Sequence, residues 1–292
     1  MPLVSVGLPV YNGVERIEAV VRSVLGQDHA DLELVISDNA STDGTEQLCR
    51  SLVAEDPRIV YHRNPVNVGL LNNFVGALRL ARGEFFRWVG DDDWLAPNCV
   101  SRGLDVFADD PRLILVTSQV DYTGPDGVTA TAPYAGAALR SDDPVVRLTE
   151  MLRLLNESHL IIDPLYGMVR RDPVVGIERR NMLREDEVYA TKLALAGPWG
   201  HVPEVLAKRN WKHETPSILA RRLDVPAWQA HFATTLQCRT MLDYVRQADA
   251  LTEDQRRRAM VEVGKMYARR QRIVATRRAR KLVSLARDLV PR

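Results

Sequence analysis

The sequence predicts an α/β fold with a mainly parallel sheet flanked by helices, followed by a helical C-terminal extension. Its first 120 residues alternate short apolar runs with helical patterns of roughly 10 to 15 residues, which is typical of βαβ units. From about Ser217 onward nearly every segment is compatible with a helix, and none has the pattern of a strand. The length of 292 residues allows one large domain with an extension, or two smaller domains.

The expected strands are the short apolar runs of the first part of the chain, residues 4–8, 33–37, 59–62, 85–89 and 113–118. The helices expected between them cover residues 14–25, 45–54, 71–81 and 97–107. Pro97 suits the start of the last of these helices, because its missing N–H group costs no hydrogen bond there.

The middle of the chain is less regular. Residues 121–145 contain most of the Gly, Pro and Asp of this region and lack a clear period, so we expect irregular chain or a hairpin. The pattern becomes helical again over residues 144–155 and 184–196.

The composition is that of an ordinary globular protein, with 46% hydrophobic and 26% charged residues. This excludes collagen-like, disordered and disulfide-scaffold proteins. No apolar run approaches the roughly 18 residues that a membrane-spanning helix needs, and the first residues lack the pattern of a signal peptide. We therefore expect a cytoplasmic protein whose three cysteines, Cys49, Cys99 and Cys238, are buried free thiols.

Charge is distributed unevenly, although the net charge is only +1. Residues 256–292 contain 13 basic and 2 acidic side chains, a net +11, so the remaining 255 residues carry −10. An acidic body argues against a nucleic-acid-binding protein. The basic tail also carries Leu282, Leu285 and Leu289 at helical spacing, the pattern of a helix at an anionic membrane surface. The alternative is that this apolar stripe packs on the protein's own core.

Polar residues follow three of the expected strands. Pro9, Tyr11 and Asn12 follow the first strand, residues 38–45 follow the second, and residues 90–94 follow the fourth. Because ligands bind at the carboxyl ends of the strands in an open α/β sheet, we expect a ligand site where these segments meet.

Three consecutive carboxylates, Asp91, Asp92 and Asp93, are hard to explain as a structural turn. Like charges this close raise one another's pKa unless a cation neutralises them. Carboxylate oxygens suit Mg²⁺ or Mn²⁺, which typically take one or two carboxylates together with the phosphates of a substrate. The alternative is a solvated acidic turn that caps the helix at Pro97.

Asp38 is expected at the last position of its strand, where its carboxylate can accept a hydrogen bond from a base N–H or a ribose hydroxyl. The alternative for this segment is that it merely starts the next helix, with Asp43 or Ser41 as the cap. The ring of Tyr11 either lies against a base or packs in the core beneath the sheet.

Taken together, these motifs resemble the family 2 glycosyltransferases of the GT-A fold, over about residues 1–215. The resemblance is carried by PVYNG, DNASTDGT and NVGLLNNFVGALRLARGEFFRWVGDDDW, in their order, spacing and strand context. The chain departs from the family at the metal motif, where Gly90-Asp91-Asp92 stands in place of the frequent Asp-x-Asp. The resemblance implies a Rossmann-like sheet with a nucleotide-binding half, residues 1–120, and an acceptor half, residues 121–215. Residues 216–292 then form a helical C-terminal region with the basic tail.

The resemblance also implies a role for each motif residue of the donor site. Asp92 would coordinate Mn²⁺ or Mg²⁺ on the diphosphate, Asp91 would lie by the ribose or sugar, and Asp93 would contact the sugar or support the site. The remaining donor-binding residues are Pro9, Tyr11, Asn12, Asp38, Asn39 and Asn67.

Two later segments are similar to further parts of the family. Asp186, in the run Arg184-Glu185-Asp186-Glu187, is matched with the catalytic base, and the alternative is an exposed acidic helix start favoured by the helix dipole. Residues 210–213 are similar to the segment that closes over the diphosphate, with Lys212 supplying charge and His213 touching the metal or a phosphate. The alternative for His213 is a partly buried histidine beside Trp211.

The activity implied is inverting glycosyl transfer. A metal on Asp92 acts as a Lewis acid on the leaving nucleotide diphosphate, and Asp186 removes the proton of an acceptor hydroxyl as it attacks the anomeric carbon. The expected donor is a UDP-sugar, or else a dTDP-sugar, and the acceptor is a glycan, a lipid-linked molecule or a small molecule. The alternatives are a sugar nucleotidyltransferase, which usually has a Gly-rich loop with a basic residue after the first strand, and a non-catalytic nucleotide-sugar-binding or membrane-docking adaptor.

Overall fold

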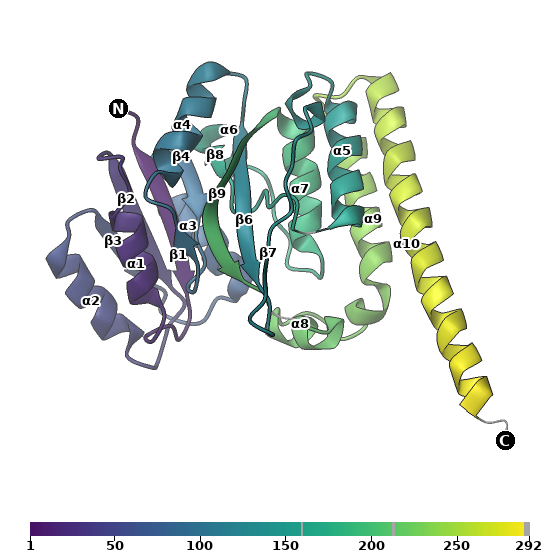
Figure 1. Cartoon of the computed structure of the whole chain (residues 1–292), viewed down its shortest axis with the longest axis horizontal. Helices are drawn as coiled ribbons and strands as arrows, with labels where there is room; N and C mark the ends of the chain where they lie inside the picture. The colour runs from purple at the N-terminus through teal and green to yellow at the C-terminus, as the bar shows by residue number, and fades with distance from the viewer. Residues whose placement is uncertain (159, 212–213, 289–292) are drawn as a thin grey trace.

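A curled sheet forms the centre of the molecule, with helices on both of its faces and a group of long helices at one side (Figure 1). The computed structural model describes residues 1–158, 160–211 and 214–288. Within them the strand order is β3-β2-β1-β4-β8-β6-β9-β5, with β7 paired to β6. One face of the sheet buries residues of α1, α2 and α4, and the other buries residues of α3, α5, α6 and α7.

The first half of the chain forms the parallel part of the sheet, as predicted. Its strands are β1 (Val4–Val10), β2 (Leu32–Asp38), β3 (Ile59–Arg63) and β4 (Phe85–Trp88), and they pair in parallel. The helices are α1 (Ile17–Leu25), α2 (Thr45–Glu55), α3 (Leu70–Leu80) and α4 (Cys99–Asp109). Pro97 lies just before α4 rather than within it.

The second half of the sheet is mixed. Its strands are β5 (Trp94–Leu95), β6 (Leu115–Thr123), β7 (Thr129–Ala130), β8 (Met168–Arg170) and β9 (Trp199–Asn210). β8 is antiparallel to both β4 and β6, whereas β6 and β9 are parallel to each other. β6 and β7 form the hairpin expected after residue 121, and a 3₁₀ turn η1 (Ala138–Arg140) follows it.

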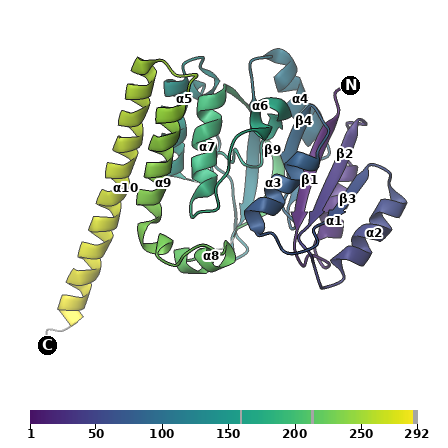
Figure 2. The ribbon, with the colours of Figure 1, turned by 180° about the vertical axis from the view of Figure 1, so that it is seen from behind.

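The helices of the later part of the chain pack together beside the sheet. They are α5 (Pro144–Glu157), α6 (Arg171–Val175), α7 (Glu185–Ala196), α8 (Pro216–Arg222), α9 (Gln229–Gln247) and α10 (Glu253–Asp288). One buried apolar cluster contains Leu148 of α5, Val188 of α7, Met241 of α9 and Val263 of α10. The C-terminal helices therefore share a core with the rest of the molecule, and only the last part of α10 extends beyond it (Figure 2).

Two further expectations concern the cysteines and the membrane. Cys49, Cys99 and Cys238 are buried and unpaired, as predicted. None of the helices in the described parts of the chain is both long and apolar enough to cross a bilayer.

Candidate active site

The loops that follow the parallel strands meet at one edge of the sheet. The N–H of Asn39 donates to the carbonyl of Val10 (2.9 Å), and the N–H of Asn64 donates to the carbonyl of Asp38 (2.8 Å). These bonds continue the strand pairing by one residue and bring the first two polar segments side by side.

Asn12 joins the loops after β1 and β2. Its N–H donates to the hydroxyl of Ser41 (2.9 Å), and its side-chain oxygen accepts from the N–H of Thr42 (2.9 Å). Its φ of 52° is left-handed, a conformation that Asn tolerates better than most residues. Pro9 is buried within β1. The side chain of Tyr11 is 48% exposed, so the expectation that it packs in the core is wrong, and its ring is open to a ligand.

Asp38 ends β2, as predicted, but its side chain is completely buried. One carboxylate oxygen accepts from the N–H of Ser41 (2.9 Å) and the other from the hydroxyl of Tyr61 (2.7 Å). Both oxygens therefore shape the loop around the site. Asp43 accepts from the N–H of Thr45 (3.1 Å), the first residue of α2, so the predicted helix start is also present.

Asn39 brings a fourth segment to the same edge. Its amide nitrogen donates to the side-chain oxygen of Asn67 (2.9 Å), and its own side-chain oxygen accepts from the N–H of Val68 (2.8 Å). Asn39 is buried and Asn67 is exposed. Asn39 therefore positions the loop that presents Asn67.

The three carboxylates after β4 point to different partners. Asp91 pairs with Arg16 of the loop after β1 (2.5 Å). Asp93 is buried, accepts from the N–H of Gly90 (2.7 Å) and pairs with Arg209 (3.2 Å). The carboxylate of Asp92 has no hydrogen-bond or ion-pair partner within the described residues. The turn does not cap α4, because the side chain that bonds the start of that helix is Gln27, which accepts from the N–H of Val100 (3.0 Å).

This arrangement fits one kind of metal site and not another. In the parts of the chain that the structure describes, no three His, Cys, Asp or Glu side chains converge on a point, so an ion held entirely by protein does not fit. A single free carboxylate at Asp92 fits an Mg²⁺ or Mn²⁺ ion that takes its other oxygens from water and a diphosphate. Lys212 and His213 lie outside the described residues.

Arg209 of β9 is a component of the site that the sequence did not reveal. Its guanidinium pairs with Asp93 and with Asp163 (2.5 Å) and lies 3.3 Å from the ring centroid of Tyr166. The hydroxyl of Tyr122 also donates to Asp163 (2.8 Å). One buried cation therefore neutralises carboxylates from two separate segments and ties β9 to the turn after β4.

Asp186 lies in the first turn of α7. The residue as a whole is exposed, and its carboxylate forms no ion pair with any described residue. The surrounding protein still desolvates it, and this effect, together with the charges of Glu187, Glu185 and Asp163, raises its pKa to about 6. The exposed position of Asp186 in the first turn of α7 is also the one expected for an acidic helix start.

The neighbours of Asp186 differ from it in having cationic partners. Glu185 is paired with Arg179, and Glu187 is paired with Arg184 (2.6 Å) and Arg270 (2.6 Å). Asp186 is thus the acid of this run without an ion-pair partner among the described residues.

Asp163 is connected to both acidic clusters, residues 91–93 and residues 185–187. Its carboxylate is bonded to Arg209, which holds Asp93, and its charge raises the pKa of Asp186. Asp163 therefore lies near both the turn at residues 91–93 and the start of α7, which about 90 residues of sequence separate.

Comparisons with known proteins point to one family. The family described as Glycosyl transferase family 2 matches residues 5–174 of this chain. Abequosyltransferase RfbV of Salmonella typhimurium is 35% identical over 144 residues, which are 48% of this chain and 42% of that protein. The GalNAc(5)-diNAcBac-PP-undecaprenol beta-1,3-glucosyltransferase of Campylobacter jejuni is 35% identical over 102 residues, 35% of this chain and 33% of that protein. The chain thus matches less than half the length of either relative.

Among solved structures, that of S. aureus TarS residues 1–349 in complex with UDP is similar to this fold. The TM-score is 0.63 at 18% sequence identity, covering 89% of this chain and 70% of that one. At this identity the likeness concerns the fold, a curled sheet flanked by helices.

Proposed function

Because the chain belongs to glycosyl transferase family 2, we propose that it moves a sugar from a nucleotide-diphosphate sugar to an acceptor hydroxyl. The observation that carries this proposal is the pair of carboxylates without cationic partners at one site. The carboxylate of Asp92 is available among the described residues to a diphosphate-bound cation, and the raised pKa of Asp186, about 6, suits a base.

In this proposal the donor lies across the carboxyl ends of β1 to β4. The exposed ring of Tyr11 stacks on the base, and the loops held by Asp38 and Asn39 surround the nucleoside. Asn12, Asn67 and Asp91 contribute polar groups at its edge, with Lys212 and His213 assigned to the diphosphate. When bound at Asp92, Mn²⁺ or Mg²⁺ supplies Lewis-acid stabilisation of the leaving diphosphate. A UDP-sugar is our first choice of donor and a dTDP-sugar the second; the TarS neighbour, described in complex with UDP, supports the former.

Asp186 acts on the acceptor side. A general base works best when its pKa is close to the working pH, because it must be ionised yet able to hold a proton. A pKa of about 6 leaves most of Asp186 ionised at pH 7 while making it more basic than an ordinary carboxylate. Asp186 takes the proton of the acceptor hydroxyl as its oxygen attacks the anomeric carbon, and this single displacement inverts the configuration.

For the acceptor we favour a lipid-linked molecule over a free glycan or small molecule. The name of the Campylobacter jejuni relative specifies an undecaprenol-linked substrate, and the last part of α10 extends beyond the body with a strongly basic sequence (Figure 1). The protein would then work on the inner face of the cell membrane, bound peripherally through anionic headgroups.

Two other functions remain to be separated from this one by experiment. A sugar nucleotidyltransferase needs cationic groups for a triphosphate after β1, but the basic residue there, Arg16, is already paired with Asp91. A non-catalytic adaptor would bind the donor and leave it intact. Breakdown of the donor therefore distinguishes an enzyme from an adaptor.

The test starts with thermal unfolding in the presence of UDP, dTDP or GDP, each with and without Mn²⁺. A nucleotide that binds only the native state raises the unfolding temperature, and we expect the largest rise for UDP with Mn²⁺. Incubation with UDP-sugars in the absence of acceptor should then release UDP slowly by hydrolysis. The proposal is wrong if no nucleoside diphosphate raises the unfolding temperature, and the adaptor is favoured if one does but its sugar is never released.

A further inference from the structure

Arg270 of α10 differs from the other basic residues around it. Arg269 and Arg272 are exposed, whereas the side chain of Arg270 is only 11% exposed and points into the helical layer. Its guanidinium bonds to three other helices, through Glu187 of α7 (2.6 Å), Gln237 of α9 (2.8 Å), and Asn156 (2.9 Å) and the carbonyl of Leu155 (3.2 Å) of α5. Such a complete set of hydrogen bonds is what a buried guanidinium requires.

The acceptor of the strongest of these bonds is Glu187, which follows Asp186 directly in the first turn of α7. One carboxylate oxygen of Glu187 binds Arg270 and the amide nitrogen of Gln237 (2.9 Å), and the other binds Arg184 (2.6 Å). The start of α7 has no side-chain cap, and its N-cap residue Arg184 has a left-handed φ of 63°. The contacts of Glu187 do not satisfy the free N–H groups of this turn, but they tie the turn that carries Asp186 to α9, to α10 and to Arg184.

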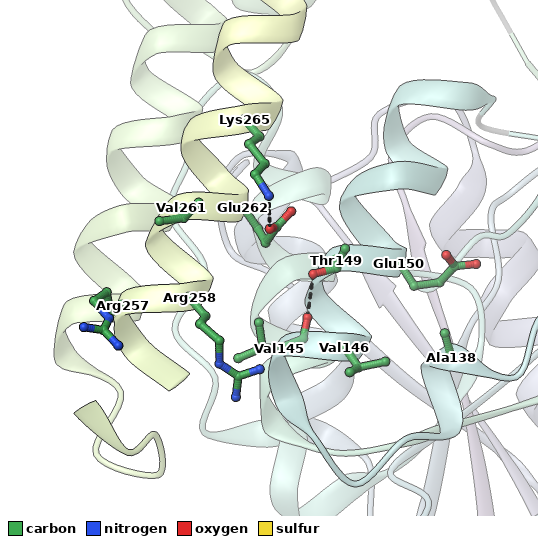
Figure 3. Close-up of a pocket in the computed structure, with 10 residues that line it drawn as sticks. All are labelled: Ala138, Val145, Val146, Thr149, Glu150, Arg257, Arg258, Val261, Glu262 and Lys265. Atoms are coloured by element: carbon green, nitrogen blue, oxygen red, sulfur yellow. Dashed lines mark hydrogen bonds and ion pairs between the residues drawn. The ribbon is translucent and has the colours of Figure 1, made fainter. Parts of the chain in front are cut away.

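Few of the described side-chain bonds connect α10 to α5, and those of Arg270 are among them. A hollow of about 580 Å³ lies between η1, α5 and α10, bordered by Val145, Val146 and Val261 (Figure 3). Within it Lys265 bonds to Glu262 of its own helix and not to α5. The described side-chain bonds that cross from α10 to α5 are at the two ends of this region, Arg258 to Asp143 (3.2 Å) and Arg270 to Asn156.

We propose that Arg270 is a positioning residue for the reaction, which holds Glu187 and thereby sets the place of Asp186. The C-terminal helix, which lies outside the segment matched by the family, then belongs to the support of the active site. This inference rests on the proposed function in that it takes Asp186 as the base.

The charges around Asp186 predict how the loss of Arg270 alters it. The groups that face Asp186 are Glu185 and Glu187 of α7, Asp163 from the segment before β8, and Arg179 from the segment after α6. Glu187 raises the pKa of Asp186, and Arg270 offsets that charge. Without Arg270, Arg184 is the one cationic partner of Glu187 left among the described residues, so we expect the pKa of Asp186 to rise further.

The experiment compares Arg270→Gln and Arg270→Lys with the matched control Arg269→Gln, which removes an exposed arginine one residue away. For each variant we would measure the amide hydrogen exchange of residues 184–190 and the pKa of Asp186, the latter from its carboxyl ¹³C shift. We would also measure UDP affinity with Mn²⁺ and the pH profile of UDP-sugar turnover. Arg270→Gln should speed exchange, raise the pKa of Asp186 and lower kcat by about 10-fold to 100-fold, the scale of a small misplacement at a reacting centre. UDP affinity should stay unchanged, Arg270→Lys should restore part of each loss, and Arg269→Gln should match the parent.

The inference is overturned if exchange, the pKa of Asp186 and kcat are the same in Arg270→Gln as in Arg269→Gln. If Arg270→Gln does not fold, Arg270→Lys decides, because it keeps the charge but not the forked hydrogen bonds; parent-like exchange and kcat in that variant overturn the inference. A third outcome separates this inference from the proposed function. If Arg270→Gln changes the exchange and the pKa of Asp186 but Asp186→Asn keeps the kcat of the parent, then Arg270 positions α7 and the base has been assigned wrongly.

Discussion

Asp92 and Asp186 each stand in a run of three acidic residues whose other two members are paired with arginines. The paired residues are Asp91 with Arg16, Asp93 with Arg209, Glu185 with Arg179, and Glu187 with Arg184 and Arg270. Pairing keeps those carboxylates ionised and fixed in direction. Within the described residues, one carboxylate in each run is thus without an ion-pair partner.

Replacing Asp186 with asparagine tests its role as the base. Asp186→Asn should lower kcat by roughly 10² to 10⁴, because general-base catalysis acts in the transition state, and should leave UDP affinity unchanged. In the parent the rate should fall as the pH drops below about 6, where Asp186 takes up a proton. Steady-state rates between pH 5 and 9 measure both effects. Weakened UDP binding with normal turnover would assign Asp186 to the donor instead.

Asp186→Asn should make the folded protein more stable at neutral pH, although it lowers kcat. The pKa of Asp186 is raised in the folded protein, which means that folding disfavours the ionised side chain. The protein therefore loses stability as the pH rises through about 6 and Asp186 ionises. Asp186→Asn should therefore unfold at a higher temperature than the parent at pH 7. The difference should vanish below about pH 4, where the parent is protonated in both states. Calorimetry at the two pH values measures it, and a variant less stable at pH 7 would contradict the raised pKa.

The sequence indicated some of these residues and not others. Asp92 and Asp186 lie in short acidic runs that a motif makes visible. Arg209 acts on Asp93 from 116 residues away and on Asp163 from 46 residues away, and no local pattern marks such a partner. Asp38 was placed correctly at the end of its strand, but its hydrogen bonds to Ser41 and Tyr61 depend on how the loops fold back.

At the scale of elements, α7 is held at both ends by arginines from other helices. Arg270 acts at its start, and Arg147 of α5 acts at its end, donating to the carbonyls of Ala194 (2.7 Å) and Leu195 (3.2 Å). The last carbonyls of a helix have no partner within it, and burial makes an unpaired carbonyl costly. These contacts connect the helix of Asp186 to α10 at its start and to α5 at its end.

Arg147→Leu tests this contact at the end of α7. The loss of a buried guanidinium and its bonds should lower the free energy of unfolding by about 2 to 4 kcal/mol, measured by urea denaturation. Arg153→Leu on the same helix is the control, because the side chain of Arg153 is half exposed and its described ion pairs are with Glu150 and Glu157 of its own helix, where such pairs contribute at most about 1 kcal/mol. Equal losses in the two variants would show that Arg147 does not stabilise the helix specifically.

The strands that the sequence predicted and those that it missed differ in length and composition. β1 and β2 have seven residues each, are buried along their whole length and are mainly apolar. β9 carries Pro203, Glu204 and Lys208 in a half-exposed pattern, and β5 and β8 are only two and three residues long. Their pairing is set by neighbouring strands, which a local pattern does not contain.

At the scale of the molecule, α10 has two parts with different surroundings. Ala259, Val263 and Met266 are buried in the helical core, whereas residues 272–276 are exposed. Of the apolar stripe expected on the tail, Leu282 and Leu285 fall within α10, and Leu289 lies outside the described residues. A truncation that tests the tail must therefore keep the first part of the helix.

Removing residues 277–292 takes away six basic residues and one acidic residue without touching the buried part of α10. If the tail meets anionic headgroups, the full chain should sediment with vesicles containing phosphatidylglycerol at low salt and less at high salt. The truncated chain should remain in solution and keep the UDP affinity of the full chain. No sedimentation of the full chain at low salt would end the membrane proposal and leave the glycosyltransferase proposal intact.

The central claim is that Asp92 holds the cation on which donor binding depends, and calorimetric titration of UDP with and without Mn²⁺ tests it most directly. The parent should bind UDP more tightly with Mn²⁺, and Asp92→Asn should lose this gain while folding normally, because the substitution relieves repulsion among three adjacent carboxylates. Asp109→Asn, at an exposed aspartate at the end of α4, is the control and should behave as the parent does. An Asp92→Asn variant that binds UDP and Mn²⁺ as tightly as the parent would contradict the account.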